Sequence, residues 1–351
     1  MNVAFCAGGT LGHIYPALSL IEIYKTKYPQ DKLFLIVSKR DKQYIENLKL
    51  DKVNDIKYIY AIGLNKNILK SLFINIKAYN EIKKYFKDNN IKLVFGFGGF
   101  ISGISIKAAK YLHIYNVIHE QNSTIGLANK WCLKYTNAFL TTFEMREYHR
   151  NQHNIGNPRY FKAKELLDNH YKSKYNLLIT SGTNGSKVIN DIAVEFLNSP
   201  YSKNFLTTLV TGKKYFHEVK AKLQEGTHYE VLPYTDKMIQ LMNKSGIAIT
   251  RSGSSTIWEL AALNCLGIYI PSPNVTNNHQ LKNAREMEKM HLGIIIREED
   301  LNLNNLISTL KIIILNYDKY KSKMLEYENN INIESIIERI HKESGEINGW
   351  V

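Results

Sequence analysis

Three glycines and a histidine end the first apolar run of the chain, which begins at Val3 and continues into the motif CAGGTLGH at residues 6–13. Glycines between a strand and a helix let backbone N–H groups approach a phosphate, and the start of a helix favours that negative charge. A histidine beside such donors is suited to removing a proton close to an anionic substrate. His13 therefore has two interpretations: a catalytic base, or a histidine that caps or packs the helix.

A second motif, RSGSSTIWEL at residues 251–260, is rich in hydroxyl groups. Residues 252–256 offer hydroxyl and N–H donors to a diphosphate at a helix start. Glu259, one helical turn later, can accept hydrogen bonds from both hydroxyls of a ribose. The alternative is a Ser or Thr helix cap followed by a capping-box glutamate.

A third motif places four hydrogen-bonding side chains, His119, Glu120, Gln121 and Asn122, at the end of an apolar run. Consecutive polar side chains that leave a buried strand indicate either a binding cleft or a solvated loop. The spacing by itself does not separate these two interpretations.

The first glycine motif departs from the dinucleotide fingerprint Gly-x-Gly-x-x-Gly, because Ala7 stands where that pattern has its first glycine. Lys39 and Arg40 follow the second apolar run, where a dinucleotide-binding protein has an acidic ribose ligand. NAD binding is therefore disfavoured. The chain also has no Asp-x-Asp metal motif, so we predict neither a cofactor nor a metal.

These motifs need a scaffold, and the chain alternates short apolar runs with amphipathic stretches of helical length. The expected strands are NVAFCA, KLFLIV, KLVFGF, YNVIHE and NAFLTT in the first half, and NLLIT, FLTTLVT, YEVLP, GIAIT and GIYIPSP in the second. This pattern predicts an α/β protein with two parallel-sheet domains. Turn residues and a polar stretch at 156–175 predict the hinge between them, and the amphipathic stretch after about residue 330 can pack on either domain.

Composition limits the classes of protein. The 351 residues, 44% hydrophobic and 22% charged, suffice for two globular domains. Three distant cysteines, no secretory signal and no apolar stretch of about 18 residues favour a cytoplasmic protein that does not span membranes. The net charge of +14 is compatible with an anionic partner or with compositional bias alone. No basic block is interleaved with stacking aromatics, so nucleic acid is not an expected partner.

Seven motifs, in order, resemble those of the MurG family of N-acetylglucosaminyltransferases, which convert lipid I to lipid II in peptidoglycan synthesis. They are GGTLGHIYPAL, GFGGFISG, HEQNSTIGLANK, IGNPR, SGTNGS, RSGSSTIWELAAL and NNHQLKNAR. The resemblance implies the GT-B fold, with two Rossmann-like domains whose parallel sheets face an interdomain cleft. The expected domains are residues 1–158, which bind acceptor and membrane and include a returning helix at about 331–351, and residues 159–330, which bind UDP-GlcNAc.

The resemblance also assigns roles to residues. His13 and Asn122 correspond to catalytic positions, with Glu259 on the uridine ribose and Gln280 on the donor sugar. The full set of substrate contacts carried over is Thr10, Leu11, Gly12, Asn122, Arg159, Thr183, Thr235, Ser254, Ser255, Thr256, Ile257, Trp258, Glu259 and Gln280. By this resemblance the first glycine loop faces the acceptor pyrophosphate, and the loops of the second domain hold the donor.

The chain departs from the family pattern at three places. Leu11 replaces a usual glycine, SGTNGS replaces Gly-Gly-Ser-Gln-Gly-Ala, and GNPR lacks one residue before Arg159. Two alternative functions therefore stay open. One is another GT-B enzyme, such as a UDP-GlcNAc 2-epimerase or a glycolipid glycosyltransferase, and the other is a non-catalytic protein that binds a sugar nucleotide.

Residues 64–87 combine apolar side chains at helical spacing with lysines, a pattern typical of helices that bind a membrane surface. The apolar residues are Ile68, Leu69, Leu72, Phe73 and Ile76, and the lysines are Lys66, Lys70, Lys77, Lys83, Lys84 and Lys87. The alternative is an ordinary amphipathic helix whose apolar face packs on the sheet. Because the family docks on the cytoplasmic leaflet through its first domain, the resemblance predicts a peripheral protein on the anionic inner leaflet of the cell membrane.

Overall fold

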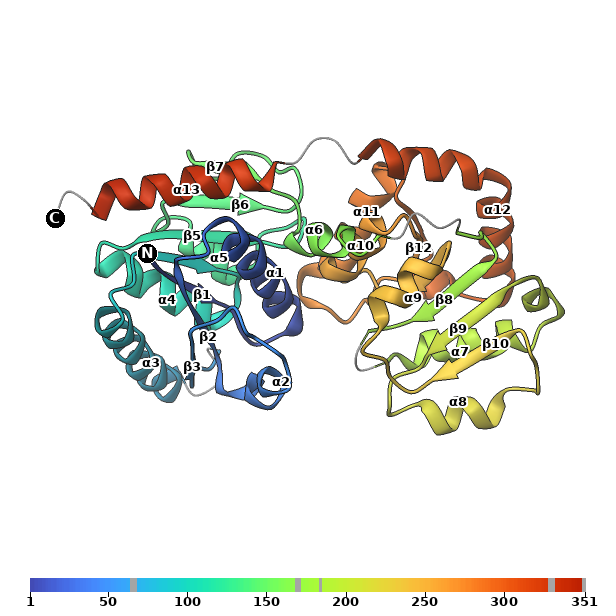
Figure 1. Ribbon diagram of the computed structural model, residues 1–351. Coiled ribbons are helices and arrows are strands. Elements are labelled where there is room, and N and C mark those ends of the chain that lie inside the picture. The colour runs from blue at the N-terminus through green and yellow to red at the C-terminus, as the bar shows by residue number, and fades with distance from the viewer. Residues whose placement is uncertain (64–67, 168–171, 183–184, 328–331, 349–351) are drawn as a thin grey trace. The chain divides into compact units, whose positions relative to one another are not determined.

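The computed structural model describes residues 1–63, 68–167, 172–182, 185–327 and 332–348 (Figure 1). The chain forms two compact units, one of residues 1–159 and 331–351 and the other of residues 160–330. We call them unit 1 and unit 2. Each unit is an α/β domain built on its own parallel sheet, as the alternation of apolar runs and amphipathic stretches predicts.

The sheet of unit 1 has seven strands in the order β3-β2-β1-β4-β5-β6-β7, all pairing in parallel. Its strands are β1 (Asn2–Cys6), β2 (Lys32–Ser38), β3 (Asp55–Ile59), β4 (Leu93–Gly96), β5 (Tyr115–Glu120), β6 (Ala138–Thr141) and β7 (Gln152–Asn154). Its helices are α1 (Leu11–Lys27), α2 (Lys42–Glu46), α3 (Ile68–Asp88), α4 (Gly99–Tyr111), α5 (Leu127–Cys132) and α13 (Ile333–Asn348), and α6 (Pro158–Lys164) crosses the unit boundary. The short 3-10 helix η1 spans Lys39–Asp41.

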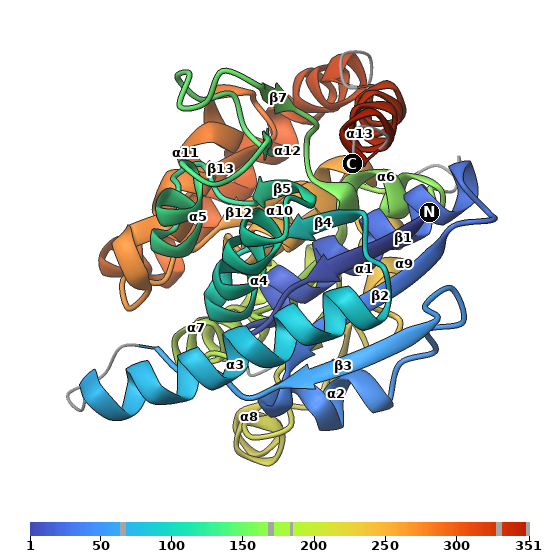
Figure 2. The same ribbon diagram turned by 90° about the vertical axis from the view of Figure 1, so that its left-hand side faces the viewer.

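The central strands of this sheet are buried on both faces, which explains their continuous apolar sequences. Ala4 of β1 belongs to the core that α3 and α4 cover, and these two helices lie side by side on that face (Figure 2). The next residue, Phe5, points to the opposite face, where its ring centroid lies 5.9 Å from that of Tyr24 on α1. Alternating side chains of one strand thus build two cores, one on each side of the sheet.

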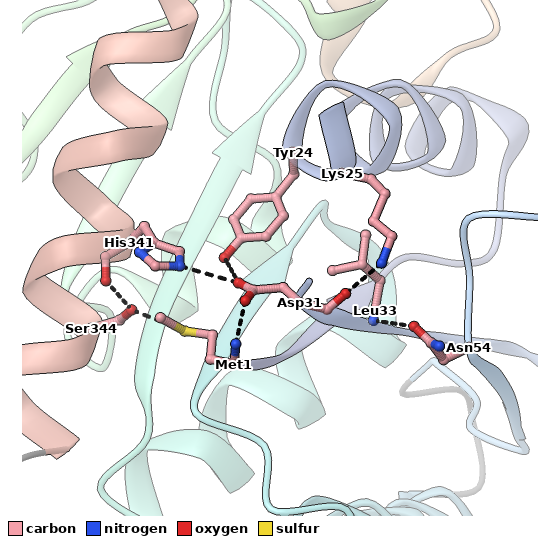
Figure 3. A network of polar contacts seen from close by, with 8 residues as sticks. All are labelled: Met1, Tyr24, Lys25, Asp31, Leu33, Asn54, His341 and Ser344. Carbon is pink, nitrogen blue, oxygen red and sulfur yellow. Dashed lines mark hydrogen bonds and ion pairs between the residues drawn. The ribbon is translucent and has the colours of Figure 1, made fainter. Parts of the chain in front are cut away.

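The last helix, α13, packs on unit 1 through a buried carboxylate (Figure 3). Asp31 accepts hydrogen bonds from the Tyr24 hydroxyl at 2.9 Å and from His341 Nε2 at 3.1 Å, and it pairs with the N-terminal ammonium of Met1. The His341 ring also stacks on Tyr28, with 3.8 Å between the ring centroids. The end of the described chain is therefore fastened to the unit that contains its beginning.

The sheet of unit 2 has six parallel strands in the order β10-β9-β8-β11-β12-β13. These strands are β8 (Asn176–Thr180), β9 (Leu206–Val210), β10 (Tyr229–Leu232), β11 (Ile247–Thr250), β12 (Leu266–Tyr269) and β13 (Gly293–Ile295). The helices are α7 (Lys187–Leu197), α8 (Phe216–Lys222), α9 (Met238–Lys244), α10 (Ser254–Ala262), α11 (His279–Lys289) and α12 (Leu303–Glu326). Three short 3-10 helices are η2 (Pro200–Asn204), η3 (Thr276–Asn278) and η4 (Glu298–Asp300).

The ten apolar runs that predict strands all contain one, but three strands have no counterpart among them. These are β3, β7 and β13, and each lies at an edge of its sheet. An edge strand is only partly buried, so β3 and β7 carry polar residues that interrupt the apolar pattern. Within the described ranges, no helix is both long and apolar enough to cross a bilayer.

Candidate active site

The first glycine loop connects β1 to α1 in unit 1. Thr10 is the N-cap residue of α1, Leu11 and Gly12 open the helix, and the Thr10 side chain makes no capping hydrogen bond. Gly9 has a φ of +90°, a conformation that L side chains rarely adopt. The Gly9 N–H donates a hydrogen bond to Asp41 Oδ2 at 3.0 Å. An internal carboxylate, which the sequence analysis overlooked, thus binds an N–H group of this loop.

His13 is fastened to the same loop. Its Nδ1 lies 3.2 Å from the carbonyl oxygen of Gly8 and 3.2 Å from Thr10 Oγ1. Because a carbonyl oxygen only accepts, Nδ1 carries the proton in this contact, and Nε2 of the neutral ring is then the basic nitrogen. The cap position belongs to Thr10, so His13 is not the capping residue. Its geometry is suited to a general base.

The glycine pair of GFGGF makes room for this arrangement. Gly98 and Gly99 have φ values of +88° and +76°. A Cβ on Gly99 would lie 2.4 Å from the Gly8 carbonyl oxygen, and a Cβ on Gly98 would lie 3.1 Å from His13 Nε2. Side chains at these positions would displace the loop or the imidazole, so the two glycine motifs form one structure around His13.

The loop after β5 is organised by Glu120, which is buried. Its Oε1 accepts hydrogen bonds from the backbone N–H of Asn122 at 3.0 Å and from the Asn122 side chain at 3.2 Å. Its Oε2 accepts from the Gly126 N–H at 2.8 Å and from Asn129 Nδ2 at 2.9 Å. An ordered loop of this kind argues against a freely solvated one. Asn122 is held in place by Glu120, which the sequence analysis did not single out from its neighbours.

His119 is fully enclosed beneath this loop, and burial lowers its pKa to about 4, so its ring is neutral at pH 7. Its Nε2 lies 3.2 Å from Thr142 Oγ1 and 3.3 Å from the carbonyl oxygen of Gly156. Gly156 belongs to the segment that leads to Arg159, whose N–H donates to Asn157 Oδ1 at 3.0 Å. The polar motif therefore fixes the backbone that carries Arg159 on α6.

In unit 2, α10 begins at Ser254, directly after β11 and its glycine turn. The N-cap residue is Gly253, and no side chain caps the helix, so the capping-box alternative for Glu259 is wrong. Ser255 Oγ is buried and has no hydrogen-bond partner among the described residues. Glu259 lies in the second turn of the helix and is buried. The N–H groups of a helix start, with hydroxyls nearby, are suited to a phosphate.

Two residues of the expected contact stretch have side chains in the core. Ile257 and Trp258 are almost completely buried. The Trp258 ring packs on Tyr160 and Tyr327, with centroids 6.0 and 5.4 Å apart. These side chains hold α10 in the unit, so at these two positions only the backbone remains for substrate contact.

Gln280 lies in the first turn of α11 and is linked to the α10 loop. Its backbone oxygen accepts a hydrogen bond from Ser252 Oγ at 2.9 Å, and its Oε1 accepts from the Ser272 N–H at 2.9 Å. The structure thus brings Gln280 together with the RSGSS turn.

Two further predicted contacts lie elsewhere in the chain. Thr235 lies after β10, and two strands separate β10 from β11. Thr183 lies outside the described residues.

Arg251 joins three segments of unit 2. Its guanidinium pairs with Glu298 and donates to the carbonyl oxygen of Ile270 at 3.0 Å and to Ser186 Oγ at 2.8 Å. Ser186 is the N-cap residue of α7, at the end of the SGTNGS motif. In the sequence this arginine is visible only as part of the RSGSS motif, because no sequence pattern shows that it braces two loops.

Two Rossmann-like units, each with glycine loops between strands and helix starts, give the chain the GT-B fold. Residues 3–141 match the glycosyltransferase family 28 N-terminal domain, and residues 176–340 match the corresponding C-terminal domain. The structure resembles a crystal structure of Acinetobacter baumannii MurG, with a TM-score of 0.77, 20% identity and coverage of 97% of this chain and 99% of the other. A UDP-N-acetylglucosamine 2-epimerase structure has a TM-score of 0.66 at 14% identity and covers 100% of this chain and 97% of its own.

Relatives in sequence identify the family more narrowly than the structural neighbours do. The UDP-N-acetylglucosamine–N-acetylmuramyl-(pentapeptide) pyrophosphoryl-undecaprenol N-acetylglucosamine transferase of Lactobacillus helveticus is 33% identical, over 99% of this chain and 100% of the relative. The protein of the same name in Oenococcus oeni is 33% identical, over 92% and 91%. The chain belongs to this transferase family, the MurG family, as its ordered motifs predict.

Proposed function

We propose that this enzyme moves N-acetylglucosamine from UDP-GlcNAc to undecaprenyl-pyrophosphoryl-MurNAc-pentapeptide, lipid I, and so forms lipid II for peptidoglycan synthesis. Family membership over nearly the whole chain supports the substrates. The observation that carries the chemistry is the contact of His13 Nδ1 with the Gly8 carbonyl oxygen, because a proton on Nδ1 makes Nε2 the basic nitrogen of the imidazole.

Unit 2 is the proposed donor-binding unit. The start of α10 and the Ser255 hydroxyl take the diphosphate, Glu259 accepts hydrogen bonds from the ribose hydroxyls, and Gln280 binds the sugar. Thr235 takes the uracil end, because strands about 4.8 Å apart put the end of β10 roughly 14 Å from the end of β11. That separation suits an extended nucleotide.

In the proposed reaction, His13 takes the proton of the acceptor hydroxyl while the oxygen attacks the anomeric carbon of the donor sugar. The new C–O bond forms as the bond from that carbon to the UDP oxygen breaks, which inverts the anomeric centre. The electron pair of the broken bond goes to UDP, whose charge the N–H groups of a helix start stabilise. Asn122, held by Glu120, orients the acceptor and does not act as a base.

Incubation with radiolabelled UDP-GlcNAc, with and without a lipid I analogue, tests this proposal against its alternatives. We expect a labelled lipid product that requires the analogue. An epimerase releases or rearranges the sugar without the analogue, and a glycolipid transferase labels another lipid instead. A non-catalytic protein binds UDP-GlcNAc and leaves it intact. Any of these three results contradicts the proposal.

We also propose that α3 docks the enzyme on the cytoplasmic face of an anionic membrane. Four apolar residues of its first half are exposed: Leu69 by 81%, Leu72 by 51%, Phe73 by 72% and Ile76 by 51%. They are not packed on the sheet, which the second half of the helix covers through Ala78, Ile82 and Phe86. The ordinary amphipathic alternative is therefore wrong for the first half. The Ile68 side chain and Lys66 lie outside the described part of the chain.

Lysines lie along the same helix as this exposed apolar patch. Lys70, Lys77, Lys84 and Lys87 are exposed, and Lys83 Nζ lies 4.3 Å from the ring centroid of Tyr111 on α4. Apolar side chains enter the acyl boundary while lysines meet anionic headgroups, each with about 1 kcal/mol. The combination supports a membrane partner for unit 1.

Vesicle flotation tests the docking. We expect wild type to float with anionic vesicles at low salt, and Leu72→Glu, Phe73→Glu or a paired Lys70→Glu and Lys77→Glu change to reduce recovery. Leu315→Glu on α12 is the matched control, because Leu315 is 84% exposed and belongs to unit 2. Equal recovery of wild type and α3 variants would exclude α3 as the docking surface. UDP-GlcNAc binding should stay unchanged in all of them.

A further inference from the structure

The guanidinium of Arg159 lies over an aromatic ring of its own unit. Its Cζ is 4.9 Å from the ring centroid of Tyr15, which lies on α1 two residues after His13. The Tyr15 ring is itself packed edge-on against Tyr44 of α2, with a centroid distance of 6.0 Å and an interplanar angle of 84°. The Tyr15 ring beneath the arginine is therefore itself packed against a second ring.

The backbone of Arg159 is held as well. Its N–H donates to Asn157 Oδ1, and the preceding Gly156 is bonded through its carbonyl oxygen to the buried His119 and through its N–H to Asn154 Oδ1 at 2.9 Å. An arginine normally loses much side-chain freedom when it binds an anion. Here the two ends of Arg159 are restrained by separate parts of unit 1.

We propose that Tyr15 is a positioning residue that holds Arg159 for the diphosphate of the sugar nucleotide. Stacking on a ring uses the flat face of the guanidinium, whereas a phosphate binds along its N–H edge, so the two interactions are compatible. The inference rests on the proposed function, which makes a nucleoside diphosphate sugar the donor. The same contact links Arg159, the cation proposed to bind the donor, to α1, whose first turn carries His13.

The chain contains a matched control. Arg146 and Tyr148 form the same kind of pair in unit 1, with 4.5 Å between Cζ and the ring centroid. Both side chains are exposed, and none of the site residues belongs to this pair. Tyr148→Leu removes a stacking interaction of the same kind without touching the proposed site.

Calorimetry with UDP-GlcNAc and steady-state kinetics test the inference. We expect Tyr15→Leu to raise Kd and KM for UDP-GlcNAc about three- to tenfold with little change in kcat, which is the range of a cation–π contact at a partly exposed site. Tyr15→Phe keeps the ring and should stay within about twofold of wild type. Tyr148→Leu should equal wild type. Arg159→Lys, which replaces the planar fork by a point charge at a partly exposed position, should weaken binding in the same way as Tyr15→Leu.

A double-mutant cycle separates positioning from general damage. If Tyr15 acts through Arg159, adding Tyr15→Leu to Arg159→Ala costs no further affinity. Additive losses, or a Tyr15→Leu variant with wild-type Kd, would overturn the inference while leaving the proposed function in place. A wild-type protein that binds no UDP-GlcNAc would overturn both. Should Tyr15→Leu not fold, Arg159→Lys decides: an affinity about three- to tenfold below that of wild type supports a role for the stacked planar group, and wild-type affinity contradicts it.

Discussion

Two glycine-containing loops, one before α1 in unit 1 and one before α10 in unit 2, have the same backbone arrangement but carry different side chains. Each follows a buried parallel strand, and neither helix start is capped by a side chain. The loop of unit 1 carries an imidazole and an internal carboxylate, from His13 and Asp41. The loop of unit 2 carries hydroxyls and the buried Glu259. Local geometry makes both loops suited to anions, but the side chains around them decide what each can do.

The groups that support the two loops differ too. In unit 1 the neutral His119 links the end of β5 to the Gly156 carbonyl oxygen. In unit 2 the Arg251–Glu298 ion pair links β11 to Ser186 and the end of β12. One support depends on a ring that must stay uncharged, and the other on charges that must stay paired. The two units therefore respond differently to mutation and to pH.

The largest effect on activity is expected when His13 in the loop of unit 1 is replaced. His13→Ala should lower turnover by roughly 100- to 10,000-fold, the range for loss of a general base, while UDP binding changes little. Single-turnover rates and calorimetry measure the two quantities. His217→Ala, an exposed histidine of unit 2, is the control. A loss below about fivefold would make His13 a packing or orienting residue and would remove the catalytic difference between the loops.

The pH dependence of stability should distinguish the two supports. His119 has a folded pKa of about 4 against about 6.5 when unfolded, so below pH 6.5 only the unfolded chain takes up the proton. The stability contribution is complete above pH 6.5 and is lost as the pH falls to 4, by about 3 kcal/mol. The difference in unfolding free energy between wild type and His119→Gln, measured by denaturant titration from pH 7 to 4, should show this slope. If the unfolding free energies of wild type and His119→Gln change in parallel with pH, the His119 ring is not a buried, neutral imidazole.

Donor binding should depend on Glu259. Each charge-assisted hydrogen bond to a ribose hydroxyl contributes roughly 1.5–3 kcal/mol, so Glu259→Ala should weaken UDP binding at least about tenfold. Calorimetry checks the affinity, and the melting temperature checks the fold. Glu326→Ala, at the exposed end of α12, serves as control. An unchanged affinity would remove Glu259 from the donor site and with it the chemical distinction of the second loop.

The smallest effect is expected at Asp41. Its carboxylate binds the Gly9 N–H, so it competes with an incoming acceptor pyrophosphate for that donor. Asp41→Asn should lower the KM for a lipid I analogue about two- to fivefold, more at low salt because the site is exposed. Asp51→Asn, an exposed carboxylate elsewhere in unit 1, is the control. An unchanged or higher KM would show that the first loop does not receive the pyrophosphate.

Much of the fold follows from the sequence, because strands buried on both faces need unbroken apolar runs. This is why β1, β2, β4 and β5 are predicted from their apolar runs, whereas the half-buried β3 and β7 are not. The motifs also predict which loops carry function, since glycines and hydroxyls at strand ends are unusual. The side chains of Ile257 and Trp258 are buried, because a helix with one face in the core must bury part of any motif it carries.

The sequence alone determined the two-domain parallel α/β class, the ordered motifs and the family they indicate, because these depend on local pattern and residue identity. The tertiary structure decided which distant residues meet. It placed Gly98 and Gly99 against Gly8 and His13, Asp41 on the Gly9 N–H, and the Tyr15 ring beneath Arg159. Such pairings arise from the crossover connections of a parallel sheet, which bring segments far apart in the chain to the same carboxyl edge. The spacing of residues along the sequence does not show which segments meet at that edge.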